Sequence, residues 1–201
     1  MDDILKGYAA DAADLIERFE AISSHEVFLP VLDLLPKSPT RVADVGAGTG
    51  RDAAWFAEQG HHVLAIEPVQ ELRTARMSRR QDSRIEWLDD RLPRLTMAQD
   101  RGLFELVTVG AVWQHLEEAV QGLAMTSLSQ MIQTGGLLIM SLRHGPGATN
   151  RQVFQTSAET VINIASSCGF DLLRKVEAAS VQSDNRSNGV RWTWLALRKT
   201  R

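Results

Sequence analysis

Cysteine is almost absent from this sequence, in which Cys168 is the single one among 201 residues. One thiol forms neither an internal disulfide nor a cysteine-based metal cluster, so neither of these can hold the fold together. We therefore expect a reduced, cytoplasmic protein with no bound metal.

Long apolar runs and a surplus of basic residues are also missing. The chain starts Met1-Asp2-Asp3 without an apolar leader, and it has no run of about 18 apolar residues, the length that a membrane span requires. We expect neither export nor membrane insertion. The formal net charge is −3 and the sequence pI is near 6.0, so nucleic acid is a disfavoured partner.

What the chain does contain is an alternation of short apolar strands and helical stretches, with a hydrophobic content of 44% that suits one large domain over residues 1–201. The pattern predicts strands at 42–45, 61–66, 84–88, 103–109, 137–142, 170–179 and 190–199, and helical stretches at 2–35, 52–59, 69–80, 112–133 and 158–168. Gly60 and Gly169 are expected to end helices, Gly135-Gly136 to form a turn, and the polar residues 183–189 to join the last two strands as an antiparallel pair.

This alternation predicts an α/β fold with a mostly parallel sheet that is covered on both faces. In such sheets a ligand binds beyond the carboxyl ends of the strands, where the strand order reverses. The end of the first strand is therefore the place to look for a site.

A glycine-rich stretch, "DVGAGTGRD", follows that strand. Gly46, Gly48 and Gly50 allow a sharp turn and close approach of a ligand to the backbone. The dinucleotide fingerprint needs a glycine where Arg51 stands, which disfavours a nicotinamide dehydrogenase. A carboxylate at Asp44 is poorly placed beside a pyrophosphate and suits a cationic ligand, such as a sulfonium with an α-ammonium group. The alternative is a glycine-rich turn that binds nothing.

Three further features lie at strand ends. Glu67 ends the second strand about 20 residues after the first glycine, a spacing at which a carboxylate accepts hydrogen bonds from ribose hydroxyls. Asp89-Asp90 follows the third strand, where one side-chain oxygen suits an adenine amino group. The fourth strand runs into "GAVWQHL". Taken alone, Glu67 is more typical of a solvated strand end, and Asp89-Asp90 of a surface loop.

Together these motifs resemble the class I S-adenosylmethionine-dependent methyltransferases, and the resemblance extends to nearly the whole chain. It implies a Rossmann-like three-layer αβα sandwich whose seven-stranded sheet has the order 3-2-1-4-5-7-6, with strand 7 antiparallel. It also implies a site for S-adenosyl-L-methionine, with S-adenosyl-L-homocysteine as the product. The cofactor-binding residues it indicates are Asp44, Gly46, Ala47, Gly48, Gly50, Glu67, Pro68, Asp89, Asp90 and Gly110. Which of Asp89 and Asp90 faces the adenine stays open.

The resemblance divides the domain into an N-terminal helical segment that covers the active site (1–36), a cofactor-binding core (41–142) and a substrate-side loop, helix and strand pair (143–201). The substrate-binding candidates it places around the acceptor are Tyr8, Trp113, Arg143 and His144. His115 is the candidate general base, and a purely structural histidine is an equal alternative. Arg143 suits an anionic acceptor, or simply leaves the strand for solvent. For Trp192 and Trp194, core packing is the preferred interpretation.

The acceptor is expected to be a small molecule methylated at oxygen, nitrogen or sulfur. The chain has neither the Asn/Asp-Pro-Pro-aromatic signature used on exocyclic base amines nor a cysteine pair for attack on cytosine. The short segment after the fifth strand suggests a modest pocket with limited cover. Two alternatives are a methyltransferase acting on protein or RNA and a non-catalytic member of the fold that binds an adenosyl ligand. The oligomeric state is expected to be a monomer or a homodimer.

Overall fold

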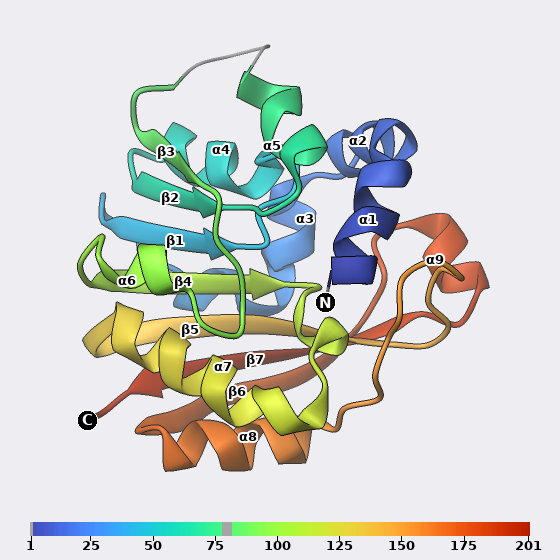
Figure 1. Cartoon of the computed structure of the whole chain (residues 1–201). Helices are drawn as coiled ribbons and strands as arrows, with labels where there is room; N and C mark the ends of the chain where they lie inside the picture. Colours follow the sequence, from blue (N-terminus) through green and yellow to red (C-terminus); the bar gives the residue numbers. More distant parts are fainter. Residues whose placement is uncertain (1, 78–81) are drawn as a thin grey trace.

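One seven-stranded sheet forms the centre of the computed structural model, which describes residues 2–77 and 82–201 (Figure 1). The strands are β1 (Arg41–Val45), β2 (His62–Ile66), β3 (Ile85–Leu88), β4 (Phe104–Gly110), β5 (Ile132–His144), β6 (Phe170–Ala179) and β7 (Arg191–Lys199). Their order in the sheet is β3-β2-β1-β4-β5-β7-β6. Only β7 runs antiparallel to its neighbours, β5 and β6, in the part of the sheet described. The expected order and the antiparallel seventh strand are confirmed.

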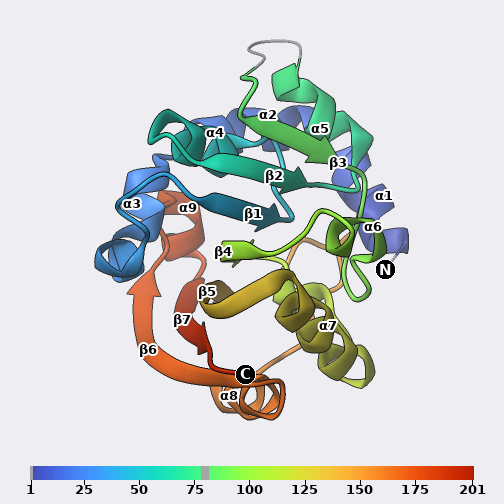
Figure 2. The ribbon, with the colours of Figure 1, turned by 90° about the vertical axis from the view of Figure 1, so that its left-hand side faces the viewer.

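Helices cover both faces of the sheet, which gives three layers (Figure 2). The helices are α1 (Asp2–Ala10), α2 (Ala12–Glu20), α3 (Ser24–Phe28), α4 (Arg51–Glu58), α5 (Gln70–Met77), α6 (Thr96–Gln99), α7 (Glu118–Met131), α8 (Ala158–Ser167) and α9 (Ser183–Ser187), with 3₁₀ helices η1 (Leu29–Leu34) and η2 (Trp113–His115). Side chains along β1 point alternately to the two faces of the sheet. Ala43 and Val45 pack toward α6, α7 and α8, and Val42 packs toward α3 and α4. The two buried faces hold the sheet between helices.

Glycines end two helices where the sequence predicts it. Gly60 (φ +94°) follows α4 and Gly169 (φ +85°) follows α8, both in the left-handed conformation that glycine adopts without a Cβ clash. The helix expected over 69–80 is observed as α5, and residues 78–80 of that prediction lie outside the described residues.

The N-terminal segment is helical as expected, but it is divided into short pieces. Ser23 accepts a hydrogen bond from the backbone N–H of Glu26 and so caps α3, while Pro30 stands at the start of η1. Both α1 and α2 lie beyond the carboxyl ends of β1 and β4 (Figure 1). These two helices therefore lie over the edge of the sheet at which a ligand is expected.

Two expectations near the C-terminal half are wrong. Gly135-Gly136 does not make a turn between elements but lies within β5, where Phe104 pairs with Ile132 and Leu106 already pairs with Leu137. The extra residues form an irregular bulge, and Gly135 (φ +84°) gives it the required backbone freedom. The polar connection 183–189 is not a simple turn either, because α9 forms within it.

Trp194 packs in the core, as preferred from the sequence. Its ring lies 5.6 Å from that of Phe28, which stacks on Trp55 with an interplanar angle of 7°. Trp192 is half-buried and packs against the same cluster. Among the described helices, none combines the length and apolar character needed to cross a membrane.

Candidate functional site

A cavity of about 880 Å³ lies at the carboxyl ends of β1, β2, β4 and β5. This volume is within the range of small-molecule sites, roughly 300–1,000 Å³. Its walls come from the N-terminal helices, the strand-end loops and the segment 178–194. Both α1 and α2 contribute to its walls, together with the segment after β5.

The glycine-rich loop between β1 and α4 forms one wall. The backbone N–H groups of Gly46 and Ala47 both donate to the carbonyl of Ile66, at 2.8 and 3.0 Å. Gly46 has φ +76° and a Cβ there would come 2.2 Å from Cγ2 of Val112, so only glycine fits. Gly48 has φ +58°, and its missing Cβ would be 3.6 Å from the ring of Phe19. Gly48 lines the cavity wall beside Phe19.

Asp44 is buried at the end of β1 with only half of its carboxyl group satisfied. Oδ1 accepts a hydrogen bond from the Thr108 hydroxyl at 2.7 Å, and Oδ2 has no partner among the described residues. Burial and the nearby Asp52 raise the pKa of Asp44 to about 7. An unpartnered buried carboxyl oxygen is costly, and a cationic ligand would compensate for that cost.

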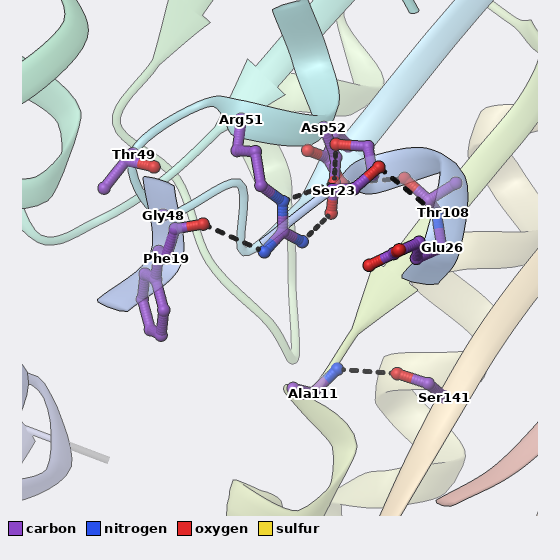
Figure 3. A network of polar contacts seen from close by, with 12 residues as sticks. Phe19, Ser23, Glu26, Gly48, Thr49, Arg51, Asp52, Thr108, Ala111 and Ser141 are labelled. Carbon is purple, nitrogen blue, oxygen red and sulfur yellow. Dashed lines mark hydrogen bonds and ion pairs between the residues drawn. The ribbon is translucent and has the colours of Figure 1, made fainter. Parts of the chain in front are cut away.

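Arg51 and Asp52 form an ion pair (Figure 3), and the charges of both act on Asp44. The Arg51 guanidinium donates to both carboxylate oxygens of Asp52, at 2.8 and 2.7 Å, and to the carbonyl of Phe19 at 3.3 Å. Ser24 donates a further hydrogen bond to Asp52 at 2.6 Å. The pair therefore connects α4 to the N-terminal segment. Nothing in the glycine motif predicts this connection.

Glu67 lines the cavity, and backbone donors already occupy its carboxylate. Oε2 accepts from the N–H of Gly48 and Oε1 from that of Val69, both at 2.8 Å. Burial raises its pKa, against these two hydrogen bonds. Each oxygen keeps a second acceptor position. Glu67 thus fixes the glycine loop and can still accept from a ligand.

The structure distinguishes Asp89 from Asp90. Asp90 lines the cavity, where its carboxylate accepts backbone hydrogen bonds from Arg91, Met97 and Ala98 at 2.8, 2.8 and 2.9 Å. Asp89 does not line the cavity and pairs with Arg73 at 3.0 Å. Asp90 is therefore the acid that faces the site.

His115 is buried and uses both ring nitrogens. Nδ1 lies 2.7 Å from the carbonyl of Gln152, and Nε2 lies 2.9 Å from the Tyr8 hydroxyl. A carbonyl only accepts, so Nδ1 carries the proton and the neutral ring accepts at Nε2 from Tyr8. Burial lowers the pKa of His115, and the charges of Arg151 and Arg143 lower it further. The imidazole is therefore neutral near pH 7.

Of the acceptor-side candidates, Tyr8, His115 and Arg143 line the cavity, whereas Trp113 and His144 do not. Trp113 is fully buried in the core. His144 follows Arg143 on β5 and points to the other side, where Nε2 meets the Thr193 hydroxyl at 2.8 Å. Pro68 and Gly110 line the cavity, and Gly50 does not.

Arg151 is a cavity residue that the sequence patterns miss. It pairs with Asp11 at 2.6 Å and lies over the Tyr8 ring, 4.7 Å from its centroid. Ala111 is another: its φ is +56°, and its N–H donates to the Ser141 hydroxyl at 3.0 Å (Figure 3). Both residues lie in irregular segments without periodicity, so only the folded chain brings them to the site.

Across residues 2–77 and 82–201, no cluster of three or more His, Cys, Asp or Glu residues suits a metal ion.

Comparison with known proteins gives a consistent result. Residues 42–136 match a family model described as a methyltransferase domain. Over 118 aligned residues the chain is 25% identical to Glycine N-methyltransferase of Mus musculus, a match that covers 52% of this chain and 40% of that protein. The chain therefore spans less than half of that relative.

Solved structures with the same fold include two methyltransferases. The 1,6-didemethyltoxoflavin-N1-methyltransferase of Burkholderia thailandensis, with 1,6-didemethyltoxoflavin and S-adenosylhomocysteine bound, has a TM-score of 0.77 and 17% identity, covering 100% of this chain and 88% of that one. The magnesium protoporphyrin IX methyltransferase of Synechocystis PCC 6803, with S-adenosylmethionine bound, has a TM-score of 0.65 and 15% identity, covering 99% and 83%. At sequence identities this low, the similarity shows a shared fold and no more.

Proposed function

We propose that this chain, whose residues 42–136 match a methyltransferase domain, is a class I S-adenosylmethionine-dependent methyltransferase that methylates oxygen, nitrogen or sulfur of a small molecule. The observation that carries this proposal is the buried Asp44 carboxyl, which lines the cavity beside the glycine loop and whose Oδ2 lacks a partner among the described residues. That arrangement suits a ligand with positive charge next to the loop.

The residues at this end of the cavity fit the cofactor. Asp44, Gly46 and Gly48 would hold its methionine portion, Glu67 the ribose, and Asp90 with the apolar Leu92 the adenine. When bound, S-adenosylmethionine supplies a methyl group on a sulfonium, so that the acceptor's lone pair displaces a neutral thioether and S-adenosylhomocysteine leaves. The protein contributes alignment and a shielded pocket.

At the other end of the cavity, Tyr8 and His115 provide a path for a proton. An acceptor O–H or N–H that donates to the Tyr8 oxygen lets Tyr8 pass its own proton to Nε2 of His115. The Nδ1–H bond to Gln152 persists in the imidazolium, so the protonated ring stays satisfied. Arg143 and Arg151 disfavour that extra charge, which helps the proton leave afterwards. We assign His115 the role of general base, acting through Tyr8.

The cover over the cavity favours a small acceptor over protein or RNA. The α1–α2 segment is held to the loop after β5 by the pairing of Arg151 with Asp11, to which Asn150 also donates at 3.0 Å. A macromolecule would have to displace this cover. Two similar proteins are named for small acceptors, glycine and 1,6-didemethyltoxoflavin.

Binding and turnover together test the proposal. Calorimetry should show saturable binding of S-adenosylmethionine and S-adenosylhomocysteine and none of NAD. Gly48→Val, which puts a branched side chain at φ +58°, should abolish that binding, while Gly122→Val on the exposed face of α7 should leave it intact. Incubation with S-adenosylmethionine and a set of small amines, phenols and thiols should then release S-adenosylhomocysteine. Binding without turnover of any acceptor would favour the non-catalytic alternative.

A further inference from the structure

The two ends of the cavity differ in charge. Asp44, Asp52 and Glu67 lie at the glycine-loop end, where Arg51 is the partner of Asp52. Arg143 and Arg151 lie at the opposite end, where Asp11 is the partner of Arg151. Arg18, Glu26 and Arg91 also line the cavity, but they are exposed. Among the lining groups that are buried or half-buried, cancelling the two pairs leaves carboxyl groups at the first end and the guanidinium of Arg143 at the second. The shielded part of the cavity is therefore polarised along its length.

Arg143 is the unusual member of this set. It is half-buried near the end of β5, and its hydrogen bond within the protein is a long one, 3.3 Å from Nη1 to the carbonyl of Gly145. No carboxylate in the described part of the chain forms an ion pair with it, whereas the shielded Arg51 and Arg151 each have one. Most of its donor capacity therefore faces the cavity unused.

The position of Arg143 connects it with the proton path. Arg143, Tyr8 and His115 line the same cavity, and the positive charge of Arg143 lowers the pKa of both the Tyr8 hydroxyl and the His115 ring. A group bound by Arg143 would therefore be held beside the atom that loses a proton. Trp192, Val190 and Val153 add apolar surface to the cavity wall.

We propose that the methyl acceptor is a small carboxylate and that Arg143 binds its carboxylate through the planar guanidinium fork. A carboxylate matches the fork with two parallel hydrogen bonds and supplies the single negative charge that the acceptor end lacks. A phosphate dianion would leave one charge uncompensated at an end where only one guanidinium is unpaired. This inference rests on the proposed methyltransferase function and specifies its substrate class.

Matched pairs of acids and amides test the inference directly. The probes are glycine and glycinamide, anthranilate and anthranilamide, and salicylate and salicylamide, which present an amine or a hydroxyl beside a carboxylate or its neutral counterpart. Their binding is measured by calorimetry with and without S-adenosylhomocysteine, and turnover is measured as S-adenosylhomocysteine released. At least one acid should bind about tenfold to a hundredfold more tightly than its amide.

Variants of Arg143 separate its role from a general effect on the fold. Arg143→Gln should remove the preference for the acid, and Arg143→Lys should keep part of it. The affinity for S-adenosylhomocysteine should stay within about twofold in both. Arg94→Gln removes an exposed arginine outside the cavity and should change none of these values.

The inference is overturned if no acid binds better than its amide, or if the preference survives in Arg143→Gln. Failure of the proposed function looks different, because S-adenosylmethionine then does not bind, or binds without turnover. In that case, the affinities of the acids and amides measured without S-adenosylhomocysteine still show whether Arg143 binds a carboxylate.

Discussion

At the scale of single residues, the site depends on a few buried groups whose protonation is set by their surroundings. Asp44 and Glu67 are buried acids with raised pKa values, and His115 is a buried base with a lowered one. All three shifts have burial as their largest cause, because burial disfavours the charged form of each group.

Replacing Asp44 with asparagine should stabilise the ligand-free protein at high pH. Between the ordinary pKa of 3.8 and the folded value of about 7, the folded state binds more protons than the unfolded state, so stability declines as pH rises through that window. Asp44→Asn removes this decline and should exceed the wild type by about 1–3 kcal/mol at pH 8. Urea unfolding at pH 4, 6 and 8 measures the difference, with the exposed Asp171→Asn as control. A constant difference across pH would contradict the explanation.

The same substitution should weaken cofactor binding. The asparagine side chain in Asp44→Asn keeps an acceptor for Thr108 but loses the negative charge, so the affinity for S-adenosylmethionine should fall about tenfold to a hundredfold at pH 8. In the wild type, that affinity should rise with pH up to about 7 and then level off, because Asp44 ionises in that range. Calorimetric titrations of both proteins across this pH range measure the two effects.

His115 should control the acid limb of the activity profile. The neutral ring is the active form and its pKa is lowered, so with S-adenosylmethionine saturating, kcat/KM for the acceptor should be flat from pH 7 to 8 and fall only below about pH 6.5. His115→Gln should reduce kcat by about 10²–10⁴-fold and remove that limb. Tyr8→Phe should also lower kcat, with the cofactor affinity unchanged. An unaltered pH profile in His115→Gln would show that the histidine is structural.

At the scale of elements, Gly122 on α7 has room for a side chain, whereas Gly136 on β5 does not. A Cβ at Gly122 on α7 meets nothing within 4 Å, whereas one at Gly136 would lie 2.9 and 3.1 Å from the carbonyl oxygens of Gln133 and Glu105. Gly122→Ala should stabilise the protein by about 0.5–1 kcal/mol, because alanine loses less backbone freedom in a helix. Gly136→Ala should destabilise it by about 1–3 kcal/mol through crowding. Thermal unfolding of the two variants compares them, and equal effects would refute the contrast.

Elements also show what a sequence can and cannot predict. The run at 42–45 is short, apolar and bounded by turn residues, so β1 and the site at its end could be predicted, and so could the order of the sheet from the family resemblance. The choice between Asp89 and Asp90, or between Arg143 and His144, could not. Neighbouring residues at a strand end point in different directions, and only the register of the folded sheet determines which one faces the cavity. The sequence does not predict the length of β5 either, since two adjacent glycines indicate a turn and a bulge equally well.

At the scale of the whole molecule, the cavity joins parts of the chain that are far apart in sequence. Thr49 in the glycine loop donates to Glu20 of α2 at 2.5 Å, and Phe19 lies over Gly48. A ligand on the loop should therefore affect α1 and α2 as well as its own contacts.

S-adenosylhomocysteine at a hundred times its Kd should stabilise the fold by about 2.7 kcal/mol. Hydrogen exchange should slow in α1 and α2 along with the glycine loop, and should not change on the exposed face of β6, which lies away from the cofactor end. Protection confined to the glycine loop would contradict the coupling between these elements.

The division of the cavity between early and late parts of the chain has a consequence for synthesis and for variation. The glycine loop and Glu67 are made early, but Arg143 and Trp192 reach the wall only when β5 and β7 are complete. The residues that hold the cofactor are therefore synthesised before Arg143 and Trp192, while Tyr8 of the acceptor end precedes them all. The same separation lets residues 143–192 change, and with them the molecule that is methylated, while the strands that hold the glycine loop stay as they are.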